Sequence, residues 1–344
     1  MVDPNDLQTI KQQVLSFWRQ WDESPDPTLT TLDQLPFELE RDFYARLHQP
    51  LGDLAGWDLY RDEYLLPLRS AFGRMHREMH LFFGGLSNGR RDGDVSKDGE
   101  LWITGTGLLH GNFDQAYLGI SPTHQAVSLR WGEFLRFRNG RLSAVYLMHD
   151  LVDFCEQIQR PVLPISQGRP GIYSRPAAAD GIQLGHSDPS VTQHSLAHIR
   201  EFLFEGLNAY DQSSLKSMGM ERFFHPHVAW YGPGGIGACL GLSEFQSLHQ
   251  QPWLTAFPDR QVQDLTGLFA EGMFTGSPGW AAVLATHRGP YLGSPATGSA
   301  LSINGLDWWK REGDRYIENW VFVDMVHLFQ QMGVNLLARA RGSA

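Results

Sequence analysis

The sequence predicts an α+β protein made of two tandem copies of one unit, each with helices first and an antiparallel sheet after them. Apolar residues recur at helical spacing just after residue 3 and again after residue 188. Strand-like runs separated by Gly- and Pro-rich turns follow in both halves. Three motif residues also recur at one fixed offset (324 − 150 = 174): Gly119 and Gly293, Thr123 and Thr297, Asp150 and Asp324.

Each half is expected to open with an amphipathic helix. Asp3-Pro4 and Asp188-Pro189 both place a good N-cap residue before a proline that costs no helical hydrogen bond. The apolar stripes that follow are Leu7, Ile10, Val14, Phe17, Trp18 and Trp21, and then Leu196, Ile199, Phe202, Leu203, Leu207 and Tyr210. Shorter helical segments are expected over residues 38–47, 59–72, 213–224 and 242–257.

Strands and turns are expected after these helices. In the second half, the strand-like runs cover residues 260–274, 280–287, 299–310 and 315–324. Asn139-Gly140 and Gly313 mark hairpin turns. The stretch 161–187 is rich in Pro and Gly with little periodicity, which is typical of a linker that runs along the surface. We therefore expect a first domain over 1–160, a linker over 161–187 and a second domain over 188–344.

Composition and charge narrow the function. The 344 residues suffice for two ordinary globular domains. Acidic residues outnumber basic ones, 38 to 28, without a basic stripe, so no nucleic-acid partner is expected. No apolar run is long enough for a bilayer, and the polar N-terminus is unlike a signal peptide, so we expect a cytoplasmic protein without a membrane partner. The two cysteines, Cys155 and Cys239, form no repeated framework, which fits a reducing compartment.

Motifs in the second half resemble a known family. The segments Thr286-His287-Arg288-Gly289, Gly293-Ser294-Pro295-Ala296-Thr297-Gly298, Glu318-Asn319-Trp320 and Asp324 resemble the pattern of the SnoaL-like polyketide cyclases, within the NTF2-like fold group. The resemblance covers most of residues 201–333, with Asn319 in the place of the pattern's histidine. The first half is more diverged: it keeps Asp150, has Tyr146 in place of the tryptophan, and has His110 near the place of the motif histidine.

The resemblance implies two tandem NTF2-like cone domains, each a curved antiparallel sheet wrapped by helices around an apolar cavity. It also implies a cyclase-like lyase or isomerase that needs no cofactor and moves a proton next to the carbonyl of a hydrophobic substrate. Single domains of this group often pair through the sheet, so two fused copies imply an intrachain pseudo-dimer. Whether whole chains associate further as a homo-oligomer stays open.

Asp324 is the predicted proton-transfer residue. Strand alternation puts it on the face that also carries Trp320 and Phe322. If that face lines a cavity, loss of water would raise the pKa of Asp324 toward neutrality and suit it to general acid/base work. His287, at a neighbouring strand end, would hold the carboxylate or polarise the substrate carbonyl. The alternative interpretations are an acid that caps the turn after the strand, and a core histidine with satisfied hydrogen bonds.

The remaining candidates complete the two predicted cavities. Asp150 and His110 are the catalytic candidates of the first half. The expected substrate-binding residues are Trp320, Phe322, His227, Trp230, Tyr146 and Met148. His225 and His227 have a metal-like spacing, but no third ligand accompanies them, so no metal site is expected.

Two functional hypotheses remain open. One is the cofactor-independent enzyme; the other is a non-catalytic protein that binds an apolar metabolite. Hydrolase or dehydratase chemistry in the same pocket is a third interpretation, because a fold alone does not define a reaction.

Overall fold

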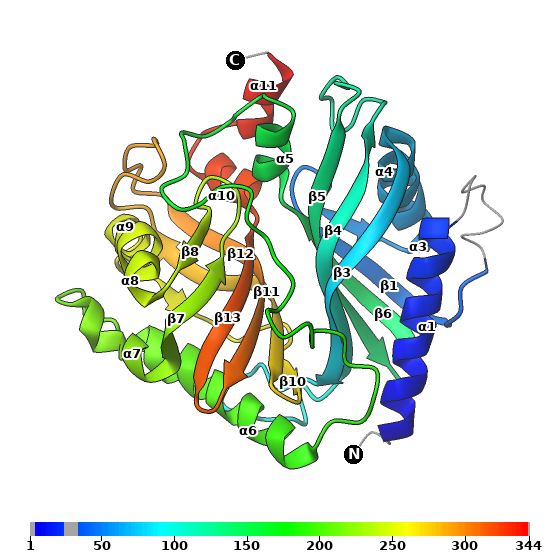
Figure 1. Ribbon diagram of the computed structural model, residues 1–344, viewed down its shortest axis with the longest axis horizontal. Coiled ribbons are helices and arrows are strands. Elements are labelled where there is room, and N and C mark those ends of the chain that lie inside the picture. Colours follow the sequence, from blue (N-terminus) through cyan, green and yellow to red (C-terminus); the bar gives the residue numbers. More distant parts are fainter. Residues whose placement is uncertain (1–3, 24–33, 343–344) are drawn as a thin grey trace.

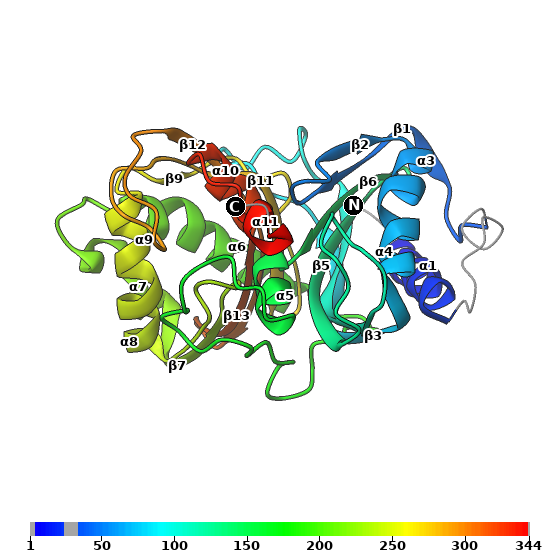
Figure 2. The same ribbon diagram turned by 90° about the horizontal axis from the view of Figure 1, so that it is seen from above.

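The computed structural model describes residues 4–23 and 34–342. It contains two curved sheets that face each other, with helices on their outer sides (Figures 1 and 2). The strand order is β2-β1-β6-β5-β4-β3 in the six-stranded sheet and β10-β11-β12-β13-β7-β8 in the seven-stranded sheet, where β9 also pairs with β11. The predicted α+β class with two NTF2-like units is confirmed.

The first half contributes residues up to the end of α5. Its helices are α1 (Pro4–Glu23), α3 (Trp57–Tyr60), α4 (Leu66–Ala71) and α5 (Leu151–Gln157), and a π-helical turn, Arg61–Leu65, joins α3 to α4. Its strands are β1 (Leu39–Leu47), β2 (Asp53–Ala55), β3 (Phe72–Leu86), β4 (Leu101–Phe113), β5 (Ala126–Arg138) and β6 (Arg141–His149).

The second half begins at α6 and repeats this plan. Its helices are α6 (Pro189–Arg200), α7 (Met220–Phe223), α8 (Leu242–Glu244), α9 (Gln251–Ala256), α10 (Met325–Gln331) and α11 (Leu336–Arg341). Helical turns at Glu201–Gly206, Leu207–Ala209, Leu215–Met218 and Phe245–Gln250 extend or connect them. Its strands are β7 (Phe224–Tyr231), β8 (Ala238–Leu240), β9 (Gln261–Val262), β10 (Phe269–Glu271), β11 (Phe274–Thr286), β12 (Ala300–Glu312) and β13 (Arg315–Val323).

Both opening helices form where the sequence predicts them. The apolar stripe of α1 is buried, with Val14 and Trp18 among its most enclosed side chains, and the helix packs on β3 and β4. Asp188 caps α6 by accepting a hydrogen bond from the backbone N–H of Ser190 at 2.8 Å. Asp3, the corresponding cap of α1, lies outside the described residues.

The helical segment predicted over residues 38–47 is wrong. This segment is strand β1, which pairs antiparallel with β2 and parallel with β6. Its side chains alternate in burial, with Phe43, Ala45 and Leu47 inward, and pairing on both edges outweighs the local helical pattern. The second half has the same parallel pair, β7 with β13, so each otherwise antiparallel sheet contains one parallel pair.

The repeat extends well beyond the three motif residues. Strands β5 and β6 and helix α5 have the same bounds as β12, β13 and α10 after an offset of 174 residues (300 − 126 = 174). Both hairpins turn at the predicted glycines, Gly140 and Gly313. One strand–turn–strand–helix unit is therefore repeated without insertion.

The two halves pack through the sheet faces that point toward each other. The contact is an aromatic cluster that includes Phe134 and Tyr146 from the first half and Trp308 and Trp320 from the second. Trp308 also donates a hydrogen bond across the interface from Nε1 to Thr104 Oγ1 at 2.8 Å. At Gly132, any Cβ atom would lie 2.4 Å from the Trp308 ring, so the close packing there requires glycine.

The connecting segment takes part in this interface. The ring of Tyr173 is buried between the halves and contacts Tyr231 and Phe322, and its hydroxyl lies 2.6 Å from Thr106 Oγ1. The expectation that the whole segment runs along the surface is therefore wrong at this point, because an aromatic side chain anchors it in the interface.

Candidate active site

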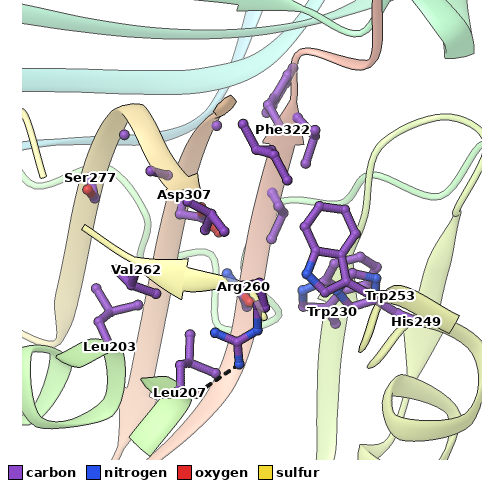
Figure 3. Close-up of a pocket in the computed structure, with 18 of the residues that line it drawn as sticks. Leu203, Leu207, Trp230, His249, Trp253, Arg260, Val262, Ser277, Asp307 and Phe322 are labelled. Carbon is purple, nitrogen blue, oxygen red and sulfur yellow. Dashed lines mark hydrogen bonds between the residues drawn. The ribbon is translucent and has the colours of Figure 1, made fainter. Parts of the chain in front are cut away.

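The second half encloses a cavity of about 160 Å³ between its sheet and its helices (Figure 3). Strands β12 and β13 form one wall, and the segments around α6, α8 and α9 form the opposite walls. Most of the lining is apolar or aromatic, including Phe202, Leu203, Leu207, Phe224, Trp230, Phe245, Trp253, Val262, Trp309 and Val321. Such a space can hold a small hydrophobic molecule.

Alternation along the two wall strands decides what faces the cavity. On β12, Gly305, Asp307 and Trp309 border it, whereas Trp308 points into the interface between the halves. On β13, Asn319 and Val321 border it. The missing side chain at Gly305 leaves room in the middle of the wall, directly beside a carboxyl group.

Asp307 is the acidic residue of this lining. It is partly accessible because it borders the cavity, yet the surrounding protein removes it from bulk water. This desolvation raises the pKa of Asp307 to about 8, and a hydrogen bond with the Asn319 side chain opposes the shift only in part. Asn319 is itself fixed by donating from Nδ2 to the carbonyl oxygen of Trp308 at 2.9 Å. Asp307 can therefore exist in both protonation states near neutral pH.

Two cavity residues on the helical side carry nitrogen-containing side chains. The His249 ring stacks on Trp230 with the ring centroids 4.2 Å apart, and burial lowers its pKa to about 3, so this imidazole is neutral. Arg260 borders the cavity where α9 leads into β9. The cavity thus contains a carboxyl group on the strand wall and a guanidinium group across from it (Figure 3).

Asp324 lies outside this lining. Its Oδ1 accepts a hydrogen bond from the backbone N–H of His327 at 3.0 Å and caps α10, and its Oδ2 accepts from the backbone N–H of Gln49 at 2.9 Å. Burial raises the pKa of Asp324 to about 6. The contacts are those of the capping alternative, with an added bond to the first half, and a catalytic role for Asp324 stays a prediction.

Asp150 makes the mirror-image contacts in the first half. Its Oδ1 accepts from the backbone N–H of Asp153 at 3.0 Å and caps α5, and its Oδ2 accepts from Gly234 N–H of the second half at 2.7 Å. Arg130 Nη1 lies 3.3 Å from the same carboxylate. The two aspartates therefore hold the opposite half reciprocally, each through the loop that follows β1 or β7.

The two predicted histidines do not occupy equivalent places. His287 is fully buried, with Nδ1 3.0 Å from Thr297 Oγ1 and its ring against Phe257, and burial lowers its pKa. His110 pairs across the sheet with Ser128, whereas Ser302, 174 residues later, pairs with Leu284.

The counterpart of His110 is therefore Leu284, and Phe113 occupies the place of His287. The expected match failed because the offset between the histidines (287 − 110 = 177) differs from that of the strands. His110 lies 3.0 Å from Glu78 on the partly exposed part of the first sheet.

The predicted lining residues divide between the cavity and the interface. Trp230 lines the cavity, and Phe322 borders it although its ring packs on Tyr173 and Trp308. Trp320, Tyr146 and Met148 belong to the cluster between the halves, and His227 is exposed. The cause is the choice of face: the aromatic face of β13 packs against the first half, and the opposite face lines the cavity.

The corresponding space in the first half is almost filled. Trp131 stands at the position of Gly305, and only about 10 Å³ remains among Trp18, Tyr60 and their neighbours. Glu133 stands at the position of Asp307, and burial raises its pKa to about 7. Its Oε1 accepts a hydrogen bond from the Tyr60 hydroxyl at 3.4 Å. The first half retains the acid but has no room for a ligand.

The sequence does contain a signal for Asp307. The offset of 174 residues aligns Asp307 with Glu133, so both copies carry one acid inside an otherwise apolar strand segment, Gly305-Leu306-Asp307-Trp308 and Trp131-Gly132-Glu133-Phe134. Asn319 was noted only as a departure from the family pattern, and Arg260 has no motif around it.

The fold and cavity define an α+β cone domain with an enclosed apolar pocket. Residues 199–332 match the family model described as SnoaL-like polyketide cyclase, so the second half contains a SnoaL-like domain. The predicted resemblance is confirmed there. No curated protein matches the chain.

Several solved structures are similar to one half of the chain. A protein assigned as a SnoaL-like polyketide cyclase from Jannaschia sp. CCS1 is 15% identical with a TM-score of 0.38, and the match covers 44% of this chain and 99% of that one. One assigned as a polyketide cyclase from Acidithiobacillus ferrooxidans is 22% identical with a TM-score of 0.32, covering 43% and 97%. TsrD from Streptomyces laurentii is 21% identical with a TM-score of 0.32, covering 42% and 97%.

Two further observations concern partners. Within residues 4–23 and 34–342, none of the helices combines the length and apolar character needed to span a membrane. The same residues contain no group of three His, Cys, Asp or Glu side chains placed to hold a metal ion.

Proposed function

We propose that the second-half cavity binds a hydrophobic carbonyl compound and that Asp307 moves a proton to and from the carbon next to its carbonyl group. This is chemistry of the cyclase or isomerase type and needs no cofactor. The observation that supports it most strongly is a carboxyl group with a pKa of about 8 at the edge of an enclosed apolar cavity. The SnoaL-like family match agrees with this class of reaction.

The proton transfer follows from the surroundings of Asp307. The ionised carboxylate takes the proton from the carbon and leaves an enolate; the neutral acid then returns a proton to the rearranged product, and the enzyme regains its starting state. A pKa near neutrality allows both steps at the same pH. Asn319 holds the carboxyl group in place, and the aromatic walls keep bulk water away from the enolate.

In this proposal the first half serves as the scaffold of an intrachain pseudo-dimer. Its own cavity is filled by Trp131, and its sheet supports the strands that carry Asp307 and Asn319 from behind. Asp150 and Asp324 hold the two halves together. The predicted catalytic roles of Asp324 and His287 are rival assignments within the same function.

Proton exchange on a simple aromatic ketone tests the proposal. We expect the protein to accelerate the loss of α-protons from 2-tetralone in D2O above the buffer rate, as followed by proton NMR. Asp307→Asn should reduce this acceleration at least about 100-fold, because loss of a general acid/base typically costs about 10²–10⁴-fold.

Two matched variants complete the test. Glu133→Gln alters the equivalent buried acid of the first half and should leave the exchange rate unchanged. Asp324→Asn keeps an acceptor for the cap and should also retain activity. Full activity in Asp307→Asn would contradict the proposal, and loss of activity only in Asp324→Asn would return the catalytic role to Asp324.

A further inference from the structure

Arg260 is a buried cation at the cavity. The residue is 7% exposed and borders the cavity between α9 and β9. Its Nη2 donates to the carbonyl oxygen of Leu207 at 2.9 Å and lies 3.1 Å from the sulfur of Met218. Within residues 4–23 and 34–342 its guanidinium forms no ion pair with a carboxylate.

Such a side chain is costly unless an anion accompanies it. Burial lowers the pKa of Arg260 to about 10, which leaves the guanidinium charged at neutral pH. A desolvated charge without a counter-charge is unfavourable, and buried charges are therefore usually paired. The carbonyl oxygen of Leu207 satisfies only part of a group that has five N–H donors.

The other polar groups of the lining do not supply this counter-charge. Asp307 is mostly protonated at neutral pH because its pKa is about 8. His249 is a neutral imidazole, and Asn319 is an uncharged amide already bonded to Trp308. The space between Arg260 and Asp307 is bounded by apolar side chains such as Leu203, Leu207 and Val262 (Figure 3).

We propose that the ligand of this cavity carries a carboxylate on an apolar or aromatic body, and that Arg260 binds this carboxylate while the reacting carbonyl lies near Asp307. One positive charge balances one negative charge, so a carboxylate fits better than a phosphate dianion. The planar guanidinium can form parallel hydrogen bonds to both carboxylate oxygens. This inference rests on the proposed function and names the substrate class: hydrophobic oxo acids.

A pair of probes that differ only in charge tests the inference. Cinnamate and cinnamamide have nearly the same size and aromatic body, but only cinnamate is anionic. We expect the wild-type protein to bind cinnamate at least about 10-fold more tightly by isothermal titration calorimetry, since a charge-assisted hydrogen bond is worth about 1.5–3 kcal/mol. Equal affinity for the two compounds, or binding of neither, would overturn the inference without any variant.

Variants then locate the preference. Arg260→Met should abolish it by weakening cinnamate and not cinnamamide, and Arg260→Lys should restore part of it. Arg311→Met is the matched control, because Arg311 is also 7% exposed but lies outside the cavity lining, where it bonds to Ser195 and Gly313. A carboxylate preference that survives in Arg260→Met would assign the anion to another group and contradict the inference.

The inference and the proposed function can fail separately. Asp307→Asn should keep the preference for cinnamate while it loses proton exchange on 2-tetralone. If exchange depends on Asp307 but no carboxylate preference exists, the substrate class is wrong and the function stands. If the preference depends on Arg260 but exchange does not depend on Asp307, the cavity binds acids without the proposed chemistry.

Discussion

At the scale of single residues, the same kind of side chain has different roles in different surroundings. Asp307 and Asp324 are both removed from water and both have a raised pKa. Asp324 has backbone N–H donors on both carboxylate oxygens, whereas Asp307 borders free space. Only Asp307 has room for a substrate beside it. The sequence predicted the chemistry of a desolvated aspartate but chose the wrong strand face for the cavity.

The raised pKa of Asp307 predicts how stability depends on pH. In the folded protein Asp307 keeps its proton up to about pH 8, while in the unfolded chain it loses the proton near pH 4. The native state therefore binds more protons between these values, and this residue makes the protein less stable as the pH rises through that window. Asp307→Asn removes the effect.

We expect the free energy of unfolding of Asp307→Asn, measured by urea denaturation, to exceed that of the wild type increasingly from pH 5 to pH 8. The gain should reach on the order of 1–3 kcal/mol and level off above about pH 8. Glu133→Gln offers an internal comparison, because its gain should level off near pH 7. Wild-type and Asp307→Asn curves that stay parallel across this range would contradict the pKa assignment.

At the scale of elements, local sequence signals predicted most of the fold. The caps, the apolar stripes of α1 and α6 and the hairpin glycines act over a few residues, so they could be read directly. Strand β1 was mistaken for a helix because its identity depends on pairing with β6, almost 100 residues away. The place of His110 was misjudged because cross-strand register, and not motif distance, decides which residues correspond.

Helix α10 gives a prediction about the strand–helix junction. Asp324→Ala removes both the cap of α10 and the bond from Gln49, so we expect a loss of about 1–3 kcal/mol in the free energy of unfolding. Asp324→Asn keeps an oxygen acceptor and should lose less. Urea denaturation of both variants checks this, and an Asp324→Ala protein as stable as the wild type would show that these bonds contribute little.

At the scale of the whole molecule, two copies of one unit have diverged in what they enclose. Trp131 fills the first cavity and Gly305 leaves the second one open, while the outward sheet faces of both halves are consumed by the shared aromatic cluster. The sequence predicted the doubled architecture, because the offset of 174 residues is visible in it. It could not show which copy is open, since that depends on how large side chains meet across the sheet and helices.

The central claim is that Asp307 exchanges protons near neutral pH inside the second cavity. Carbon-13 NMR of the aspartate carboxyl groups, with Asp307→Asn to assign the signal, measures this directly and needs no substrate. We predict one carboxyl resonance that titrates near pH 8 and is absent from the variant. An Asp307 resonance that titrates near pH 4, as in an exposed aspartate, would contradict the account.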